Sequence, residues 1–221
     1  MTPRPFTVDP SVMDRIRPMA ALDAASVAEL HHAAMGRSTW AMLGVGFLKA
    51  LYASLIDDDR FLGFVYEEDR RVRGFIAGSQ DTDAMMGATF RRAWPVLAWA
   101  AMPNLLSPRL IARLVQTHRY GSLSGGEGTA ESLFCSFEPD LRGKRVSGHI
   151  NKVLFDDLLA RGHSAVKVTT ETDNEGANRQ LQSWGFELSG TFRFYGKEMV
   201  VYRLDLEASD RVEPISRHPA V

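Results

Sequence analysis

Cysteine is nearly missing from this chain of 221 residues, which contains only Cys135. A single cysteine cannot form a disulfide within the chain, and it cannot supply the ligands of a cysteine-rich metal site. We therefore expect no metal and no internal disulfide, and the composition fits a protein of the reducing cytoplasm.

The chain also lacks an excess of charge of either sign, because its formal net charge is −1. No global field favours nucleic acid or an anionic membrane, so any anion must be held by a local cluster. The longest apolar run, AWPVLAWAAM at 93–102, is too short to span a bilayer and predicts a buried or covering helix, with a lipid-facing patch as the alternative. The first fifteen residues have no apolar core and are not expected to form a signal peptide.

What is present is a succession of short apolar elements. At 221 residues the chain is long enough for one sizeable core and short for two. We expect a single domain at 14–206, a loose tail at 1–13 and a disordered tail at 207–221. In the first half, apolar spacing predicts strands at 14–19, 61–66 and 72–79, helices at 23–35 and 40–56, and a helical insertion with a glycine-rich loop at 81–130.

In the second half, strands and helices alternate. The pattern predicts strands at 131–137, 165–171, 186–195 and 199–206, and helices at 147–161 and 174–184. A strand–helix–strand succession with this spacing implies a parallel pair and a right-handed crossover. The expected fold is α/β with a mixed sheet (α+β mixed). A doubly wound dinucleotide-binding fold fits poorly, because no glycine-rich turn follows the first strand.

The most informative segment is the turn at 141–148, LRGKRVSG, where the helix of the second half begins. Backbone N–H groups at a helix start and the positive end of the helix dipole suit a phosphate or pyrophosphate. Arg142, Lys144 and Arg145 add a basic cluster. A solvated charge run would be the default interpretation elsewhere, but the position at a helix start favours phosphate.

The order of elements over residues 14–206 resembles the GNAT superfamily of acyl-coenzyme A-dependent N-acyltransferases. Three segments carry the resemblance: Ile16-Arg17-Pro18-Met19 followed by Asp23 resembles the opening strand and helix cap, FEPDLRGKRVSG at 137–148 resembles the cofactor turn, and Asn174-x-x-Ala177 followed by Gly185-Phe186 resembles the "N-x-x-A … G-F" segment. The resemblance implies a GNAT-like mixed, mostly antiparallel sheet with a splayed parallel pair, flanked by helices.

The resemblance also implies acetyl-CoA, or another acyl-CoA, as the cofactor. The backbone of Cys135, Ser136 and Phe137 would line the thioester and the pantetheine arm. Asn174 would hydrogen-bond that arm, besides serving as a helix N-cap. The pyrophosphate would lie on the turn residues Arg142, Gly143, Lys144, Arg145, Val146, Ser147 and Gly148.

Two positions depart from the family pattern. Arg145 stands where the turn usually has its second glycine, which puts in question how closely pyrophosphate approaches there. Leu181 stands where members often have a tyrosine that protonates the departing thiolate. Proton return by a side chain at position 181 is therefore unsupported.

Few side chains qualify for catalysis. Glu131, before the turn, matches an acidic position that some members use as general base, and a carboxylate paired with a cation or exposed to solvent is an equally weighted interpretation. Cys135 is not expected to be a nucleophile, because no base lies near it in sequence and a lone buried cysteine is usually core. His149 is expected to face solvent or pack on a neighbour, without a catalytic role.

We therefore expect an N-acetyltransferase that moves an acetyl group from acetyl-CoA to a primary amine of a small molecule or peptide, by direct attack in a ternary complex. No nucleic-acid partner and no stable membrane insertion are expected, and a homodimer stays open. The apolar insertion could cover the sheet, contact a second subunit or form an apolar pocket, which would favour an acyltransferase for longer acyl-CoA or acyl carrier protein thioesters. Arg145 and Leu181 would favour a degenerate CoA-binding regulatory domain.

Overall fold

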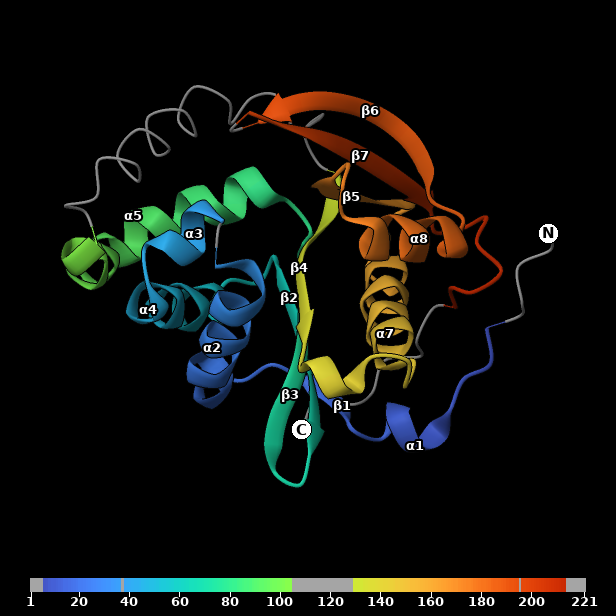
Figure 1. Cartoon of the computed structure of the whole chain (residues 1–221), viewed down its shortest axis with the longest axis horizontal. Coiled ribbons are helices and arrows are strands. Elements are labelled where there is room, and N and C mark those ends of the chain that lie inside the picture. Colours follow the sequence, from blue (N-terminus) through green and yellow to red (C-terminus); the bar gives the residue numbers. More distant parts are fainter. Residues whose placement is uncertain (1–5, 37, 105–128, 195, 214–221) are drawn as a thin grey trace.

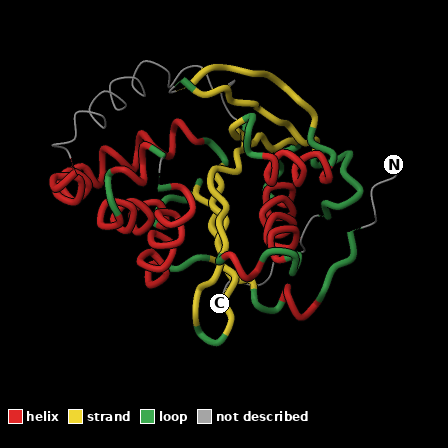
Figure 2. The backbone as a smooth tube through the Cα atoms, in the orientation of Figure 1, coloured by secondary structure: helices red, strands yellow, loops and turns green. Residues whose placement is uncertain are grey.

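The computed structural model describes residues 6–36, 38–104, 129–194 and 196–213. These residues form a seven-stranded sheet in the order β1-β2-β3-β4-β5-β7-β6, with helices on both faces (Figure 1 and Figure 2). The strands are β1 (Ile16–Pro18), β2 (Phe61–Glu68), β3 (Arg71–Ser79), β4 (Ala130–Phe137), β5 (Ala165–Glu171), β6 (Glu187–Phe194) and β7 (Lys197–Asp205).

The helices divide between the two faces, as Figure 1 shows. One face carries α2 (Ala24–Met35), α3 (Thr39–Met42), α4 (Val45–Ile56) and α5 (Thr82–Ala101), and the other carries α7 (Val146–Ala160), α8 (Glu175–Trp184) and the short α1 (Pro10–Met13). Each face buries an apolar core of its own, with Tyr52 and Phe75 in the first and Leu154 and Phe155 in the second. The sheet therefore separates two packed layers.

Strands β4 and β5 form the parallel pair of the sheet, and the other neighbours are antiparallel. Their pairing runs only from Ala130↔Val166 to Ser132↔Val168. Beyond it, residues 133–137 of β4 and 169–171 of β5 are not paired with each other, so the two strands splay. The predicted mixed, mostly antiparallel sheet with a splayed parallel pair is confirmed.

A bulge at position 133 decides which side chains of β4 face which layer. The register on β3 shifts there, so that Phe134 pairs with Ala77 while Ser132 pairs with Gly78. Side chains alternate along a strand, so without the extra residue positions 131 and 136 would lie on opposite faces. With the bulge, the side chains of residues 131 and 136 both lie on the face of α2 and α5, and those of residues 135 and 137 face α7.

Residues 40–56 form two helices rather than the single predicted helix. The break lies at Gly44, whose φ of 94° is in the left-handed region that favours glycine. A Cβ there would lie 2.6 Å from Nδ2 of Asn104. That amide donates a hydrogen bond of 2.9 Å to the carbonyl oxygen of Leu43. The apolar pattern continues across the break, which is why spacing alone did not predict it.

Both terminal segments, predicted to be loose or disordered, are packed where the structure describes them. The ring of Phe6 lies 5.5 Å from that of Trp184. Val212 is buried, and the N–H of Glu213 donates to the carboxylate of Asp156 at 2.9 Å. The partners lie on α7 and α8, far away in the sequence, so composition alone missed these contacts. Residues 1–5 and 214–221 lie outside the described residues.

The described part of the predicted insertion is α5 followed by a 3₁₀ turn, η2 (Met102–Asn104), while 105–128 lie outside the described residues. Helix α5 continues through Pro95 and packs on α4 along its buried positions Met85, Thr89, Ala93, Leu97 and Ala101. The covering helix predicted at 93–102 is thus present, although Trp94 and Trp99 are 66% and 73% exposed. Within the described ranges, no helix has both the length and the apolar character needed to cross a membrane.

Candidate functional site

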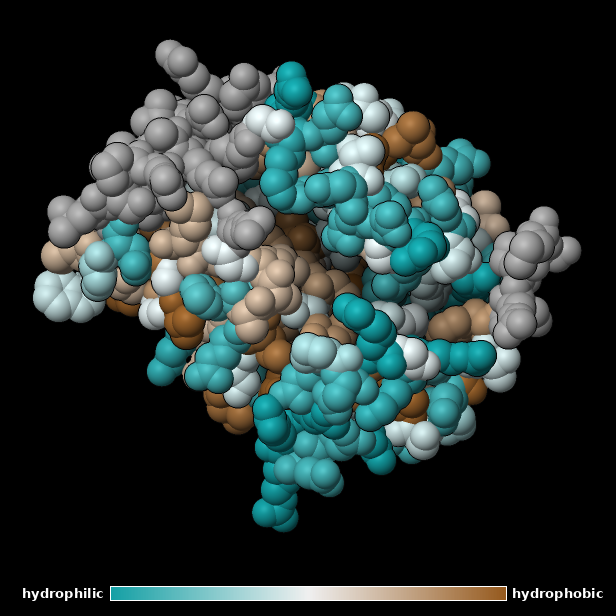
Figure 3. Space-filling view, in the orientation of Figure 1, coloured by the Kyte–Doolittle hydropathy of each residue, from teal (hydrophilic) through white to brown (hydrophobic). Residues whose placement is uncertain are grey.

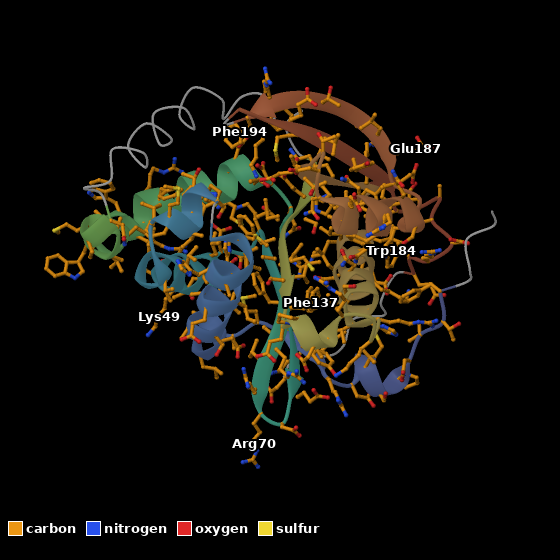
Figure 4. All side chains as sticks on the ribbon, viewed as in Figure 1. Lys49, Arg70, Phe137, Trp184, Glu187 and Phe194 are labelled. Atoms are coloured by element: carbon orange, nitrogen blue, oxygen red, sulfur yellow. The ribbon has the colours of Figure 1, made fainter. Side chains whose placement is uncertain are left out.

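The sequence-predicted turn lies where β4 ends and α7 begins, linked by a 3₁₀ turn, η3 (Pro139–Leu141). The residues predicted to line an acyl-CoA arm, Cys135, Ser136 and Phe137, lie in the part of β4 that is not paired with β5. Figure 4 shows Phe137 between β4 and α7, close to the start of that helix. The splayed strand and the helix start are therefore adjacent.

Two residues of the turn have left-handed backbone conformations. Gly143 has φ 83° and Arg145 has φ 60°. Glycine adopts this region freely, whereas it costs an ordinary residue about 1–2 kcal/mol. Arg145 stands where the family pattern has a glycine. The backbone there keeps the left-handed conformation that glycine usually adopts, although the residue is an arginine.

Among the described residues, the first N–H groups of α7 have no backbone acceptor outside the helix. The N-cap, Arg145, makes no side-chain capping bond. Its carbonyl accepts the N–H of His149 at 3.3 Å, so His149 is the first residue whose N–H has an acceptor within the helix, and the N–H groups of Val146, Ser147 and Gly148 come before it. Three N–H groups at the positive end of a 15-residue helix form a site suited to an anion.

The charge around the turn is positive because the neighbouring acids are already paired. Arg73 contacts Glu138 at 2.7 Å and also binds the carboxylates of Asp140 and Glu68. The hydrogen bond from Arg73 holds the pKa of Asp140 below its usual value. Lys144 lies 3.8 Å from that already paired carboxylate. The exposed side chains of Arg142, Lys144 and Arg145 thus add net positive charge where the N–H groups converge.

Gly74 of β3 is a supporting residue that the sequence analysis missed. A Cβ at this position would lie 2.3 Å from Cδ1 of Phe137. The missing side chain lets the Phe137 ring lie against the strand, next to the turn at 141–148. A glycine inside a predicted strand is the available signal, since such glycines often mark close approach of another group.

Glu131 lies at the start of β4 and is buried, with 8% of its surface exposed. Its Oε2 accepts a hydrogen bond of 2.9 Å from Oγ1 of Thr82 and lies 3.5 Å from Nζ of Lys167. Burial raises the pKa of Glu131, while Lys167 and the Thr82 hydroxyl oppose that shift. The carboxylate is therefore paired with a cation, and its raised pKa also suits a general base. Neither partner was predicted, because both come from other elements.

Cys135 is partly buried against α7, where Nδ2 of Asn151 lies 3.9 Å from its sulfur. Burial raises the pKa of the thiol to about 12. A thiol that stays protonated at neutral pH is a poor nucleophile, which agrees with the sequence-based expectation of a core cysteine.

Asn174 has structural partners on α8 and β5, and Leu181 is part of the core. The side-chain oxygen of Asn174 accepts the N–H of Ala177 at 3.2 Å, and its Nδ2 donates to Oγ1 of Thr170 at 3.3 Å. The predicted N-cap is therefore confirmed, while the contact of Asn174 with a cofactor stays a prediction. Leu181 is buried in the core beside Trp184, so position 181 offers no proton donor.

Known proteins resemble this chain mainly in fold. No family model matches the sequence. A curated mycothiol acetyltransferase of Brachybacterium faecium is 36% identical over 61 residues, which are 28% of this chain and only 18% of that protein. A crystal structure of an acetyltransferase covers 86% of this chain and 98% of its own, with a TM-score of 0.58 and 18% identity.

A second solved structure bears on the cofactor. The yncA protein of Salmonella typhimurium, solved with acetyl-CoA, covers 91% of this chain and 98% of its own, with a TM-score of 0.55 and 16% identity. At these identities the likeness concerns the backbone. Together with the splayed β4–β5 pair and the turn before α7, it shows that this chain has the fold of the GNAT superfamily of acetyltransferases.

Proposed function

We propose that the chain is an acyl-CoA-dependent N-acetyltransferase that transfers an acetyl group from acetyl-CoA to a primary amine of a small molecule or peptide. One observation carries the proposal: β4 parts from β5 immediately before a positively charged turn and an uncapped helix start. An unpaired strand edge suits the amide groups of pantetheine, and the turn suits a pyrophosphate. The acetyl-CoA bound to the yncA protein supports the choice of cofactor.

Each part of the proposed site has one task. The N–H groups of Val146, Ser147 and Gly148 bind the pyrophosphate, with Arg142 and Lys144 neutralising its charge. The open backbone edge at residues 133–137 aligns the pantetheine arm and gives an N–H group to the thioester oxygen, where negative charge develops. These contacts fix the thioester at the point where the strands part.

The proposed reaction is a direct transfer. A neutral amine attacks the thioester carbon, a C–N bond forms, and the C–S bond breaks to release the coenzyme A thiolate. Glu131 takes the proton that the amine loses, directly or through water, and its raised pKa brings it nearer the pH at which a base is effective. The thiolate leaves as the anion or takes a proton from water, because Leu181 supplies none.

Ligand-dependent stability tests the cofactor part of this proposal. Thermal unfolding is measured without ligand, and with acetyl-CoA or a longer acyl-CoA at about a hundred times Kd, where binding to the native state adds roughly 2.7 kcal/mol. We expect acetyl-CoA to stabilise the protein, and Arg142→Ala with Lys144→Ala to weaken that effect. Arg179→Ala is the matched control, because this arginine is 75% exposed and lies on α8 rather than in the turn.

Turnover tests the enzymatic part. With acetyl-CoA and a panel of primary amines, release of the free thiol is followed spectroscopically. Binding without turnover on any amine would support a regulatory CoA-binding domain. Stabilisation by long acyl chains alone would support the long-chain alternative, and no stabilisation by any acyl-CoA would contradict the proposed function.

A further inference from the structure

His149 in the first turn of α7 is fully buried, with 0% of its surface exposed. Its Nδ1 lies 2.8 Å from the carbonyl oxygen of Arg145, and its Nε2 lies 2.8 Å from the backbone nitrogen of Asp9. A backbone N–H can only donate, so Nε2 accepts, and Nδ1 carries the hydrogen that is donated to the carbonyl. Both ring nitrogens of a neutral imidazole are thus used, and they join the N-terminal segment to the turn.

The segment that His149 holds is itself ordered. Asp9 caps α1, since its carboxylate accepts the N–H of Ser11 at 3.0 Å. The Phe6 ring lies 5.1 Å from the imidazole, and a Cβ on Gly148 would come within 2.9 Å of Cε2 of Phe6. Phe6 therefore lies directly on the helix start. We call Phe6, Asp9 and His149 the N-terminal clasp.

The clasp acts on one particular peptide group. The Arg145 carbonyl oxygen accepts a hydrogen bond of 2.8 Å from Nδ1 of the imidazole. This contact is shorter than the 3.3 Å between the same oxygen and the backbone nitrogen of His149. The carbonyl of Arg145 and the N–H of Val146 belong to the same planar peptide unit and point in opposite directions. Fixing that carbonyl therefore fixes the first N–H of α7, beside a residue whose φ of 60° is unfavourable for arginine.

We propose that His149 is a positioning residue for the cofactor turn: the N-terminal clasp holds the Arg145–Val146 peptide so that the Val146 N–H faces the bound pyrophosphate. The identity of that anion rests on the proposed function, whereas the positioning does not. His149 touches neither thioester nor amine, so its loss weakens acetyl-CoA binding and raises the KM for acetyl-CoA, while kcat stays within about twofold.

Three variants separate the two hydrogen bonds of the imidazole. In His149→Asn the amide nitrogen takes the place of Nδ1 and keeps the bond to Arg145. In His149→Gln the amide oxygen reaches toward the Asp9 N–H and the bond to Arg145 is lost. His149→Phe loses both and keeps a ring against Phe6. Losing one hydrogen bond corresponds to about a tenfold change in Kd. We expect that change for the Gln and Phe variants, and about twofold or less for Asn.

Amide hydrogen exchange, followed by NMR without ligand, supplies a readout that does not depend on the proposed function. The Asp9 amide should stay protected in wild type and His149→Gln and exchange faster in the Asn and Phe variants. The backbone amide of residue 149, which donates to the Arg145 carbonyl, should behave in the opposite way: it should stay protected in His149→Asn and exchange faster in His149→Gln. Unchanged exchange in all three variants, or equal Kd values across them, would overturn the clasp. Failure of the wild type to bind acetyl-CoA would overturn the proposed function, and the exchange pattern would still decide the clasp.

Discussion

The two faces of the sheet present different kinds of surface. On the α7 face, residues 6–13 and 207–213 pack against α7 and α8, and the turn before α7 presents backbone N–H groups and basic side chains. On the α5 face, exposed tryptophans lie beside a buried core, and the one buried carboxylate at the strand start, Glu131, is paired. Figure 3 shows mainly apolar side chains in the middle, beside the helices of the α5 face, and mainly hydrophilic ones over the α7–α8 side.

This difference separates a general binding task from a specific one. A pyrophosphate is recognised by backbone geometry and charge, which a short segment can supply. Under the proposed function, we expect the amine acceptor to be recognised by side chains from several elements on the opposite face. Five predictions, given from the largest expected effect to the smallest, test each face and whether the two act independently.

The largest effect is expected on the α5 face. Glu131→Gln keeps the shape of the side chain and removes the base, so we expect kcat to fall about a hundredfold, at the lower end of what general bases contribute. The Kd for acetyl-CoA should stay unchanged, because the turn lies at the other end of β4. Steady-state kinetics and calorimetric binding check both. Glu187→Gln, on the exposed start of β6, is the control. If kcat were unchanged in Glu131→Gln, Glu131 would not be the base and its role would be the ion pair with Lys167.

Stability against pH reports on the same carboxyl group. Burial raises the pKa of Glu131 above its ordinary 4.5, so the folded state favours the protonated form. The stability that this provides is fully present below pH 4.5 and is lost as pH rises through the folded pKa. Denaturant unfolding at a series of pH values should show this decline in wild type and a weaker one in Glu131→Gln. If unfolding free energy fell with pH equally in wild type and Glu131→Gln, the raised pKa of Glu131 would be contradicted.

The second effect concerns the support of the cofactor site. Gly74→Ala places a methyl group 2.3 Å from Cδ1 of Phe137, so the ring must move. We expect a loss of about 2 kcal/mol in unfolding free energy, typical of overpacking, and weaker acetyl-CoA binding. Gly46→Ala is the matched control in α4, where a Cβ meets nothing within 4 Å and helix propensity predicts a gain of about 0.5–1 kcal/mol. Equal effects at the two glycines would show that Phe137 is not held by Gly74.

The elements that could be predicted from sequence are those with local causes. The turn at 141–148 and the N-cap Asn174 follow from residue types within a few positions, and the structure has both where they were expected. The partners of Glu131 are different, because Thr82 and Lys167 come from α5 and β5. Contacts between elements far apart in the chain depend on packing that periodicity does not contain. Phe6 was missed for the same reason, and His149 was placed only as facing solvent or a neighbour. The break at Gly44 was missed because the apolar pattern continues across it.

A smaller effect is expected from the turn itself. Arg145→Gly relieves a left-handed arginine, but glycine has more conformational freedom to lose on folding, so we expect a net gain of up to about 1 kcal/mol in unfolding free energy. Gly143→Ala, at φ 83° with open space around it, should instead lose about 1 kcal/mol. Denaturant unfolding of both variants tests the sign of each change in unfolding free energy. A loss in Arg145→Gly would mean that the arginine side chain stabilises the turn by more than the strain it bears.

The smallest effect is expected at the exposed tryptophans of α5. Trp94→Ser and Trp99→Ser remove side chains that are 66% and 73% exposed, so unfolding free energy should change by less than about 0.5 kcal/mol. Leu97→Ala, on the buried side of the same helix, should cost about 3 kcal/mol and shows that the assay detects packing. Acetyl-CoA binding should be unchanged in both tryptophan variants, since the cofactor turn lies on the opposite face. A change in the KM for the acceptor, with stability and cofactor binding constant, would assign this side of α5 to acceptor recognition. Weaker acetyl-CoA binding would show instead that the two faces are coupled through β4.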